Sequence, residues 1–151
     1  MKKASYRNLN VNAVKKSLIL LSLLIFSQLS FADNENYENK DVSGKNFSNL
    51  RLNFSKWSYA NATGTIYRNS KLTGADFSNA ILENADFTNA DIRYVSFSYS
   101  KGFTKEQLYC TASYKNKDIS GIVFTDKDLT AFDFSEQNLA WAAFFESILT
   151  N

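Results

Sequence analysis

The sequence predicts an all-β solenoid whose chain turns a corner once in every five residues. From Val42 to Phe97, every fifth residue is apolar or aromatic. Two positions before these residues the side chains are small from Ala60 to Ala90, and Ser or Thr usually follows the large residue. A period of five matches neither the α-helix, at about 3.6 residues per turn, nor the strand, at about two. Coils with one inward apolar residue per side, and short polar residues at the corners, account for the pattern.

A second block of the repeat, residues 117–151, begins after an interruption that shifts the register by two positions. Its inward apolar residues start at Ile119. This block is degenerate, because Lys117, Lys127 and Gln137 occupy positions where the first block mostly has small residues. An unpaired Lys is costly inside an apolar core, so we expect these sides of the coils to be distorted.

A helix is expected at the interruption, and a helix is one of two interpretations near the C-terminus. Residues 101–116 predict an insert with a short helix, since Thr104 and Gln107 have the spacing of a capping box. Residues 140–149 are open to two interpretations. They continue the repeat as two further sides, or they form an amphipathic helix that caps the last coil. A homodimer through this C-terminal end is the alternative to a cap.

The large residues of the repeat form the predicted core. Aromatic residues in a narrow core bury a large area each and can stack on one another. The core list is Phe47, Leu52, Trp57, Tyr67, Leu72, Phe77, Leu82, Phe87, Ile92, Phe97, Ile119, Phe124, Leu129, Phe134 and Leu139. Aromatic residues where the repeat falters are the candidates for an interaction surface: Tyr109, Tyr114, Trp141 and Phe145.

The first 32 residues have the features of a secretory signal peptide. Lys15 and Lys16 precede an apolar run, and small residues at Ser30 and Ala32 predict cleavage after Ala32. The apolar run is shorter than the roughly 20 residues that span a bilayer, so no stable transmembrane span is expected after cleavage. An uncleaved anchor helix is the alternative. Residues 33–39 then form a polar, flexible lead-in to the first repeat block, residues 40–100.

Composition argues against an enzyme. The chain has no His, which removes the usual general base near neutral pH and the commonest metal ligand. The single Cys110 cannot form an intramolecular disulfide. Asp76, Asp86 and Asp91 are regularly spaced, but Ca²⁺ needs oxygen ligands that converge, and corner residues on different faces diverge. We therefore expect no catalytic residue, no cofactor and no metal site.

The best copies of the repeat are Ala75-Asp-Phe-Ser-Asn79 and Ala85-Asp-Phe-Thr-Asn89. They resemble the pentapeptide-repeat family, whose pattern is Ala-Asp/Asn-Leu/Phe-x-x. The resemblance covers residues 40–100 and returns over 117–149. It implies a right-handed quadrilateral β-helix with four repeats per coil, so that residues twenty apart, such as Trp57 and Phe77, stack in one column.

These observations favour an exported, non-enzymatic scaffold of bacterial type, in the periplasm or outside the cell. It would present solenoid faces to an unknown protein or cell-envelope component. The family's best-known activity, binding DNA gyrase by mimicry of duplex DNA, is the alternative. That role implies a cytoplasmic, strongly acidic rod, whereas the chain from Asp33 onward has 12 Lys plus Arg against 15 Asp plus Glu. No nucleic-acid partner is expected, because no strongly basic face is predicted.

Overall fold

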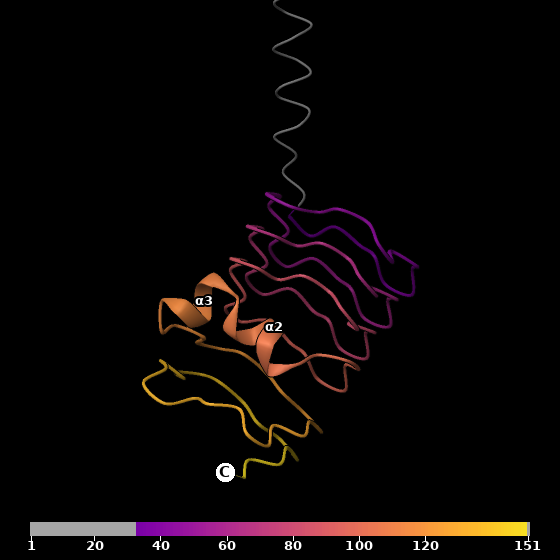
Figure 1. The fold of residues 1–151 in the computed structure, drawn as a ribbon. Helices are drawn as coiled ribbons and strands as arrows, with labels where there is room; N and C mark the ends of the chain where they lie inside the picture. The colour runs from indigo at the N-terminus through magenta and orange to yellow at the C-terminus, as the bar shows by residue number, and fades with distance from the viewer. Residues whose placement is uncertain (1–32, 151) are drawn as a thin grey trace, which may run out of the picture. The chain divides into compact units, whose positions relative to one another are not determined.

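The computed structural model describes residues 33–150, which form a stack of square coils (Figure 1). The signal peptide predicted for residues 1–32 lies outside the described residues. Parallel bridges join residues twenty apart, one on each of four sides, and these four bridges define the coil: Asn36 with Lys56, Asp41 with Asn61, Asn46 with Ile66, and Arg51 with Lys71. Parallel backbone hydrogen bonds between successive coils therefore take the place of the bonds between neighbouring strands in an ordinary sheet.

Each corner is a tight turn that the five-residue repeat encodes. In one corner, the Ala80 N–H donates to the Phe77 carbonyl over 3.0 Å, and Asn79 has a φ of 61°. A single left-handed residue at this place is the geometry of a type II turn, which Gly and Asn adopt easily. The Asp76 carboxylate accepts from the Ser78 N–H over 2.9 Å, so the residue before the large one also fixes the turn.

The core consists of side-chain columns inside the coils. The ring centroids of Trp57 and Phe77 lie 5.4 Å apart, those of Phe77 and Phe97 lie 5.7 Å apart, and both pairs are stacked. Phe47, Tyr67 and Phe87 form a second stacked column. Every other residue of the core list is buried except two, which lie in the last turns of the stack and are only partly buried: Phe134 and Leu139.

The lead-in expected at residues 33–39 is wrong. Asn36 bridges Lys56, and the Tyr37 ring stacks on Trp57 at 4.1 Å, so this segment already forms part of the first coil. Tyr37 lies five residues before Val42 and therefore in phase with the repeat. Its polar neighbours point outward and do not prevent coiling.

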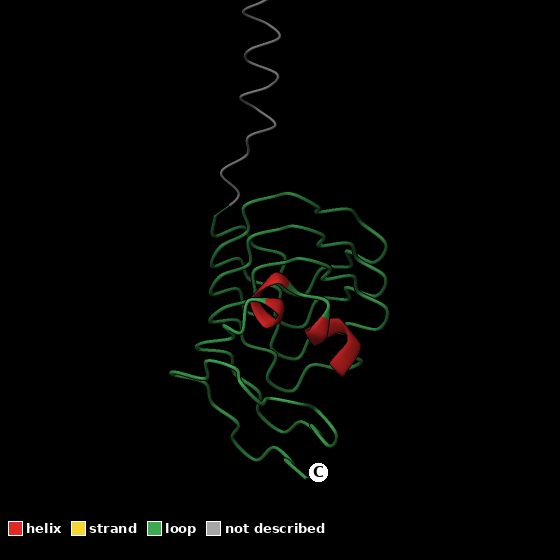
Figure 2. Ribbon diagram, turned by 60° about the vertical axis from the view of Figure 1, so that its left-hand side comes forward, coloured by secondary structure: helices red, strands yellow, loops and turns green. Residues whose placement is uncertain are grey.

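The interruption forms two short helices on one side of the coils, α2 (Lys105–Tyr109) and α3 (Ala112–Lys115), as Figure 2 shows. Thr104 caps α2: its N–H donates to Gln107 Oε1 over 2.7 Å, and its hydroxyl accepts from the Gln107 N–H. Ser96 bridges Val123, so this coil is 27 residues long instead of twenty. The seven extra residues bulge outward, and Phe124 still stacks on Phe97 at 5.8 Å.

The second block continues the coils to the end of the described residues. Val123 bridges Ala143 and Asp128 bridges Ile148, so the interpretation of residues 140–149 as a capping helix is wrong. The period of five persists there through Leu139 and Phe144, and bridges to the preceding coil satisfy backbone groups that a helix would have paired internally. Within residues 33–150, no helix has the length and apolarity needed to cross a membrane.

The two lysines of the second block avoid the core in different ways. Lys117 lies at a left-handed corner, is exposed, and places its Nζ 2.6 Å from Glu136 Oε2. Lys127 is half-buried, and its ammonium donates to the Ser100 carbonyl. Burial lowers the pKa of Lys127, although Asp126 opposes this effect. The coils therefore tolerate both lysines without losing their register.

Candidate functional site

The regularly spaced carboxylates serve the corners and do not converge. Asp76, Asp86 and Asp91 each accept a hydrogen bond from the backbone N–H two residues later. No cluster of three potential metal ligands occurs among the residues that the structure describes. Cys110 is half-buried, and its thiol donates to the Gln107 carbonyl over 3.2 Å. These groups form hydrogen bonds within turns of the coils and the insert.

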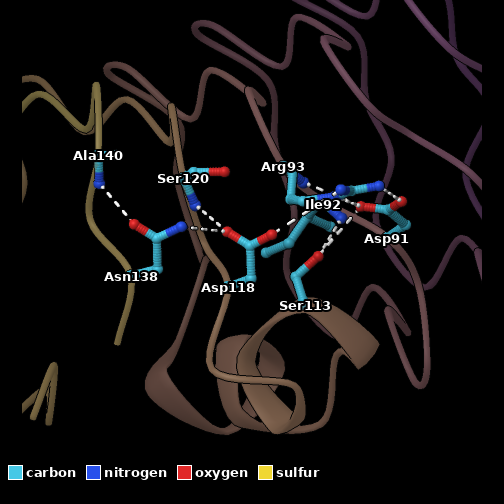
Figure 3. A network of polar contacts seen from close by, with 8 residues as sticks. All are labelled: Asp91, Ile92, Arg93, Ser113, Asp118, Ser120, Asn138 and Ala140. Carbon is cyan, nitrogen blue, oxygen red and sulfur yellow. Dashed lines mark hydrogen bonds and ion pairs between the residues drawn. The ribbon is translucent and has the colours of Figure 1, made fainter. Parts of the chain in front are cut away.

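A polar network joins the insert to the coils on both sides of it (Figure 3). Arg93 makes a bidentate contact with Asp91, at 3.0 Å through Nε and 2.7 Å through Nη2, and its Nη1 lies 3.8 Å from Asp118 Oδ2. Asn138 in the next coil donates to Asp118 Oδ1 over 3.0 Å. The network therefore spans three successive coils at the place where the register changes.

Ser113 of α3 completes this network. The Ile92 N–H donates to Ser113 Oγ over 2.9 Å, and Ser113 Oγ donates to Asp91 Oδ1 over 3.2 Å. The hydroxyl thus replaces the carbonyl that a regular coil would offer to Ile92. Burial raises the pKa of Asp91, but hydrogen bonds from Arg93 outweigh this effect and the pKa is lowered. Asp91 in turn raises the pKa of Arg93. This arrangement is a structural clamp.

The predicted interaction residues of the insert also have a structural role. The rings of Tyr109 and Tyr114 lie 4.5 Å apart. The Tyr109 hydroxyl accepts from the Asp133 N–H over 2.6 Å, and the Tyr114 hydroxyl donates to the Asp133 carbonyl over 2.8 Å. Both tyrosines therefore hold the insert to the last coil. Trp141 and Phe145, by contrast, are 85% and 74% exposed.

Trp141 and Phe145 belong to a larger surface that we call the aromatic face. Its centre is the outward column that parallel bridges define: Lys56, Asp76, Ser96, Val123 and Ala143. Among residues 33–150, every strongly exposed aromatic side chain lies on this face, and five of the six lie along its two edges. One edge holds Phe54, Tyr94 and Trp141, and the other holds Tyr59 and Tyr99. Phe145 lies between the edges, where it aligns with Thr125 of the preceding coil.

Hydroxyl groups run along the same face between neighbouring coils. Ser58 Oγ donates to Asp76 Oδ2 over 2.7 Å, and Ser78 Oγ lies 2.9 Å from Ser96 Oγ. Ser98 Oγ lies 3.1 Å from Ser96 Oγ. The same Ser98 hydroxyl then donates to Thr125 Oγ1 over 3.1 Å. The face thus combines a line of polar groups with exposed rings on either side.

Four members of the aromatic face are absent from the interaction residues predicted above: Phe54, Tyr59, Tyr94 and Tyr99. Each occupies the left-handed corner position, two residues after a core residue, where Asn and Gly are usual. An aromatic residue at that position is the signal that identifies them. Their grouping on one face becomes visible only when residues are aligned by coil, because the coil with the insert is longer than the others.

The open C-terminal end of the stack is the other notable surface. A cavity of about 470 Å³ opens there, lined by core residues such as Leu129, Phe134 and Phe144. Ile148 and Leu149 at this end are 54% and 53% exposed. No described coil covers these side chains.

Square coils with one inward residue per side define a repeat scaffold of the β-solenoid class. Residues 70–101 match the family of pentapeptide repeats, in eight copies. The chain therefore contains pentapeptide repeats over residues 70–101, and the coils around them follow the same five-residue pattern. Among curated proteins, none is significantly similar to the chain in sequence.

Solved structures of low sequence identity resemble the chain. A pentapeptide repeat protein from the thylakoid lumen of Arabidopsis thaliana is 21% identical with a TM-score of 0.49, and the match covers 70% of this chain and 62% of that one. A pentapeptide repeat protein from the cyanobacterium Cyanothece is 18% identical with a TM-score of 0.45, covering 77% and 58%. HetL from Nostoc, involved in heterocyst differentiation regulation, is 15% identical with a TM-score of 0.42, covering 78% and 46%. The chain thus spans less than two thirds of the length of each.

Proposed function

We propose that this protein is an exported, non-enzymatic scaffold that binds a cell-envelope partner through the aromatic face. The observation that carries the proposal is the gathering of all strongly exposed aromatic rings of residues 33–150 on one face. Scattered apolar residues are normal on a protein surface, whereas a contiguous group of them is typical of a binding site. The residues of the insert, in contrast, are occupied by contacts within the chain.

Export is supported by the residues before Asp33, which have the charge and apolar pattern of a signal peptide. The same feature argues against gyrase as the partner. A mimic of duplex DNA needs a dense negative surface, and the face that carries the exposed rings has Lys56 and Asp76 of opposite charge in its central column.

Cell fractionation of a bacterial host that produces the full chain tests the export proposal. We expect the protein in the periplasm or the medium, shortened by the mass of residues 1–32. An intact chain in the cytoplasm that retains Met1 would contradict the proposal. Alanine replacement of Lys15 and Lys16 provides the matched control, because it weakens the signal without touching the coils.

The open C-terminal end supports a second role, as the interface of a homodimer. Its apolar cavity and the exposed Leu149 side chain would be covered by the same end of a second copy, since a two-fold interface is self-complementary. Sedimentation analysis is expected to give a dimer that Leu149→Asp converts to monomer. A monomer at high protein concentration, with Leu149 unchanged, would contradict this role.

A further inference from the structure

The exposed rings of the aromatic face recur with a fixed spacing. The corner rings form two pairs, Phe54 with Tyr59 and Tyr94 with Tyr99, and Trp141 continues the first edge, so that successive rings on an edge are two coil steps apart. Phe145 lies between the edges, in register with Thr125. The coils between the corner rings carry Gly74 with Asn79, and Gly121 with Asp126, at the same corners. Because neighbouring strands lie about 4.8 Å apart, the rings on an edge repeat at about 9.6 Å along the stack.

On one edge the rings of Phe54 and Tyr94 lie directly against the glycines of the next coil. A Cβ built on Gly74 would lie 2.6 Å from Phe54 Cδ1, and one built on Gly121 would lie 2.0 Å from Tyr94 Cδ1. One side of each ring therefore covers a glycine. Phe54 and Tyr94 are nevertheless 59% and 49% exposed, so their outer sides face solvent. These rings are platforms on which a second flat, apolar surface can stack.

Between the two edges, the hydrogen-bonding groups are mostly uncharged. The hydroxyls of Ser58, Ser78, Ser96, Ser98 and Thr125 run along the face, and each can donate as well as accept. Such a surface suits a neutral ligand that is rich in hydroxyl groups. It lacks the row of basic side chains that would neutralise the phosphates of a nucleic acid.

We propose that the aromatic face binds an extended β-1,4-linked polysaccharide that runs parallel to the axis of the coils. The apolar faces of sugar rings would stack on the exposed aromatic rings, while their hydroxyls exchange hydrogen bonds with the serine line. In such a glycan every second sugar presents the same face, and this two-sugar repeat has nearly the length of two coils. An extended peptide fits less well, because its side chains return to one face after about 6.8 Å.

This inference rests on the proposed role of the aromatic face but does not depend on export. Binding of the purified full-length chain to insoluble cellulose and chitin, measured by co-sedimentation, tests it directly. We expect binding to both solids and none to starch, whose α-linked chain is helical. Absence of binding to cellulose and chitin, or equal binding to starch, would overturn the inference. A cytoplasmic location in the fractionation experiment would contradict export alone and leave the glycan result standing.

Two variants distinguish the effect of ring spacing on glycan binding from the effect of ring number. Tyr99→Asn removes one ring and should weaken glycan binding about three- to tenfold. Adding Asn79→Tyr restores the number of rings but places the new one a single coil from Tyr59. Both corners are left-handed, with φ values of 61° at Asn79 and 55° at Tyr99, so the exchange is matched in backbone conformation.

The double variant is expected to bind as weakly as Tyr99→Asn alone. Full recovery of binding would overturn the inference, since it would show that ring number decides and spacing does not. Ile81→Ala, on a neighbouring face, is the control and should bind like the unchanged chain. Thermal unfolding of each variant excludes loss of the fold as the cause of weaker binding.

Discussion

Replacing Gly121 with Ala probes the contact between the Tyr94 ring and the coil beneath it. The new Cβ would lie 2.0 Å from Tyr94 Cδ1 and 2.7 Å from Tyr94 Cγ, far inside van der Waals contact. The ring must therefore leave its place. Gly64 offers a matched control: its φ of +63° is close to the +67° of Gly121, but a Cβ there would meet nothing within 4 Å.

The difference in the free energy of unfolding between the two variants measures the cost of displacing the Tyr94 ring. A left-handed Ala costs about 1–2 kcal/mol through its backbone conformation, and Gly64→Ala should lose only this amount. Gly121→Ala should lose a further 1–3 kcal/mol, roughly the cost of overpacking a filled site. Urea unfolding at equilibrium gives the free energy of unfolding of each variant. The comparison is valid when the dependence of that free energy on urea concentration has the same slope in both.

A double-variant cycle identifies the ring as the cause. In a Tyr94→Ala background, Gly121→Ala should cost no more than Gly64→Ala, because nothing remains above the glycine to displace. Equal losses for Gly121→Ala and Gly64→Ala in the unchanged chain would refute the reasoning. The Tyr94 ring would then not rest on Gly121, and the platform would be lost on that edge.

Five further substitutions, in three experiments, test the core, the insert and the polar clamp. Tyr67→Phe should raise the free energy of unfolding by about 1 kcal/mol, because the buried Tyr67 hydroxyl has no hydrogen-bond partner within residues 33–150. Tyr109→Phe should lower it by a similar amount, since that hydroxyl accepts from a backbone N–H. Phe77→Asp should prevent folding by burying an unpaired charge, whereas Asn89→Asp, beside Lys115, should leave the melting temperature within a few degrees. The pKa of Asp91 is below its ordinary value of 3.8, so its contribution to stability is present above that pH and is lost as pH falls through the lower, folded-state pKa. In acid titrations followed by circular dichroism, Asp91→Asn should start less stable and lose less stability below about pH 4; parallel curves for the two chains would contradict this assignment.

The repeat itself predicted most of the architecture. The inward residues, the small residues two positions earlier and the polar corners all follow from groups within five consecutive residues. The hydrogen bonds of a turn join groups within these five residues, so the sequence of each repeat is enough to predict its corner. The capping box of α2 is equally local. The lead-in was misjudged because polar composition was given more weight than the phase of Tyr37, which places that ring on Trp57.

Other features depended on contacts between distant residues. The insert lengthens one coil to 27 residues, and this length decides that Tyr94 and Trp141 share an edge of the aromatic face. The backbone pairs that define this edge, such as Tyr94 with Ser120 and Gly121 with Ala140, form only when the coils stack. Local sequence therefore specifies that each repeat turns a corner, whereas long-range hydrogen bonds decide which corners meet and which side chains form a surface.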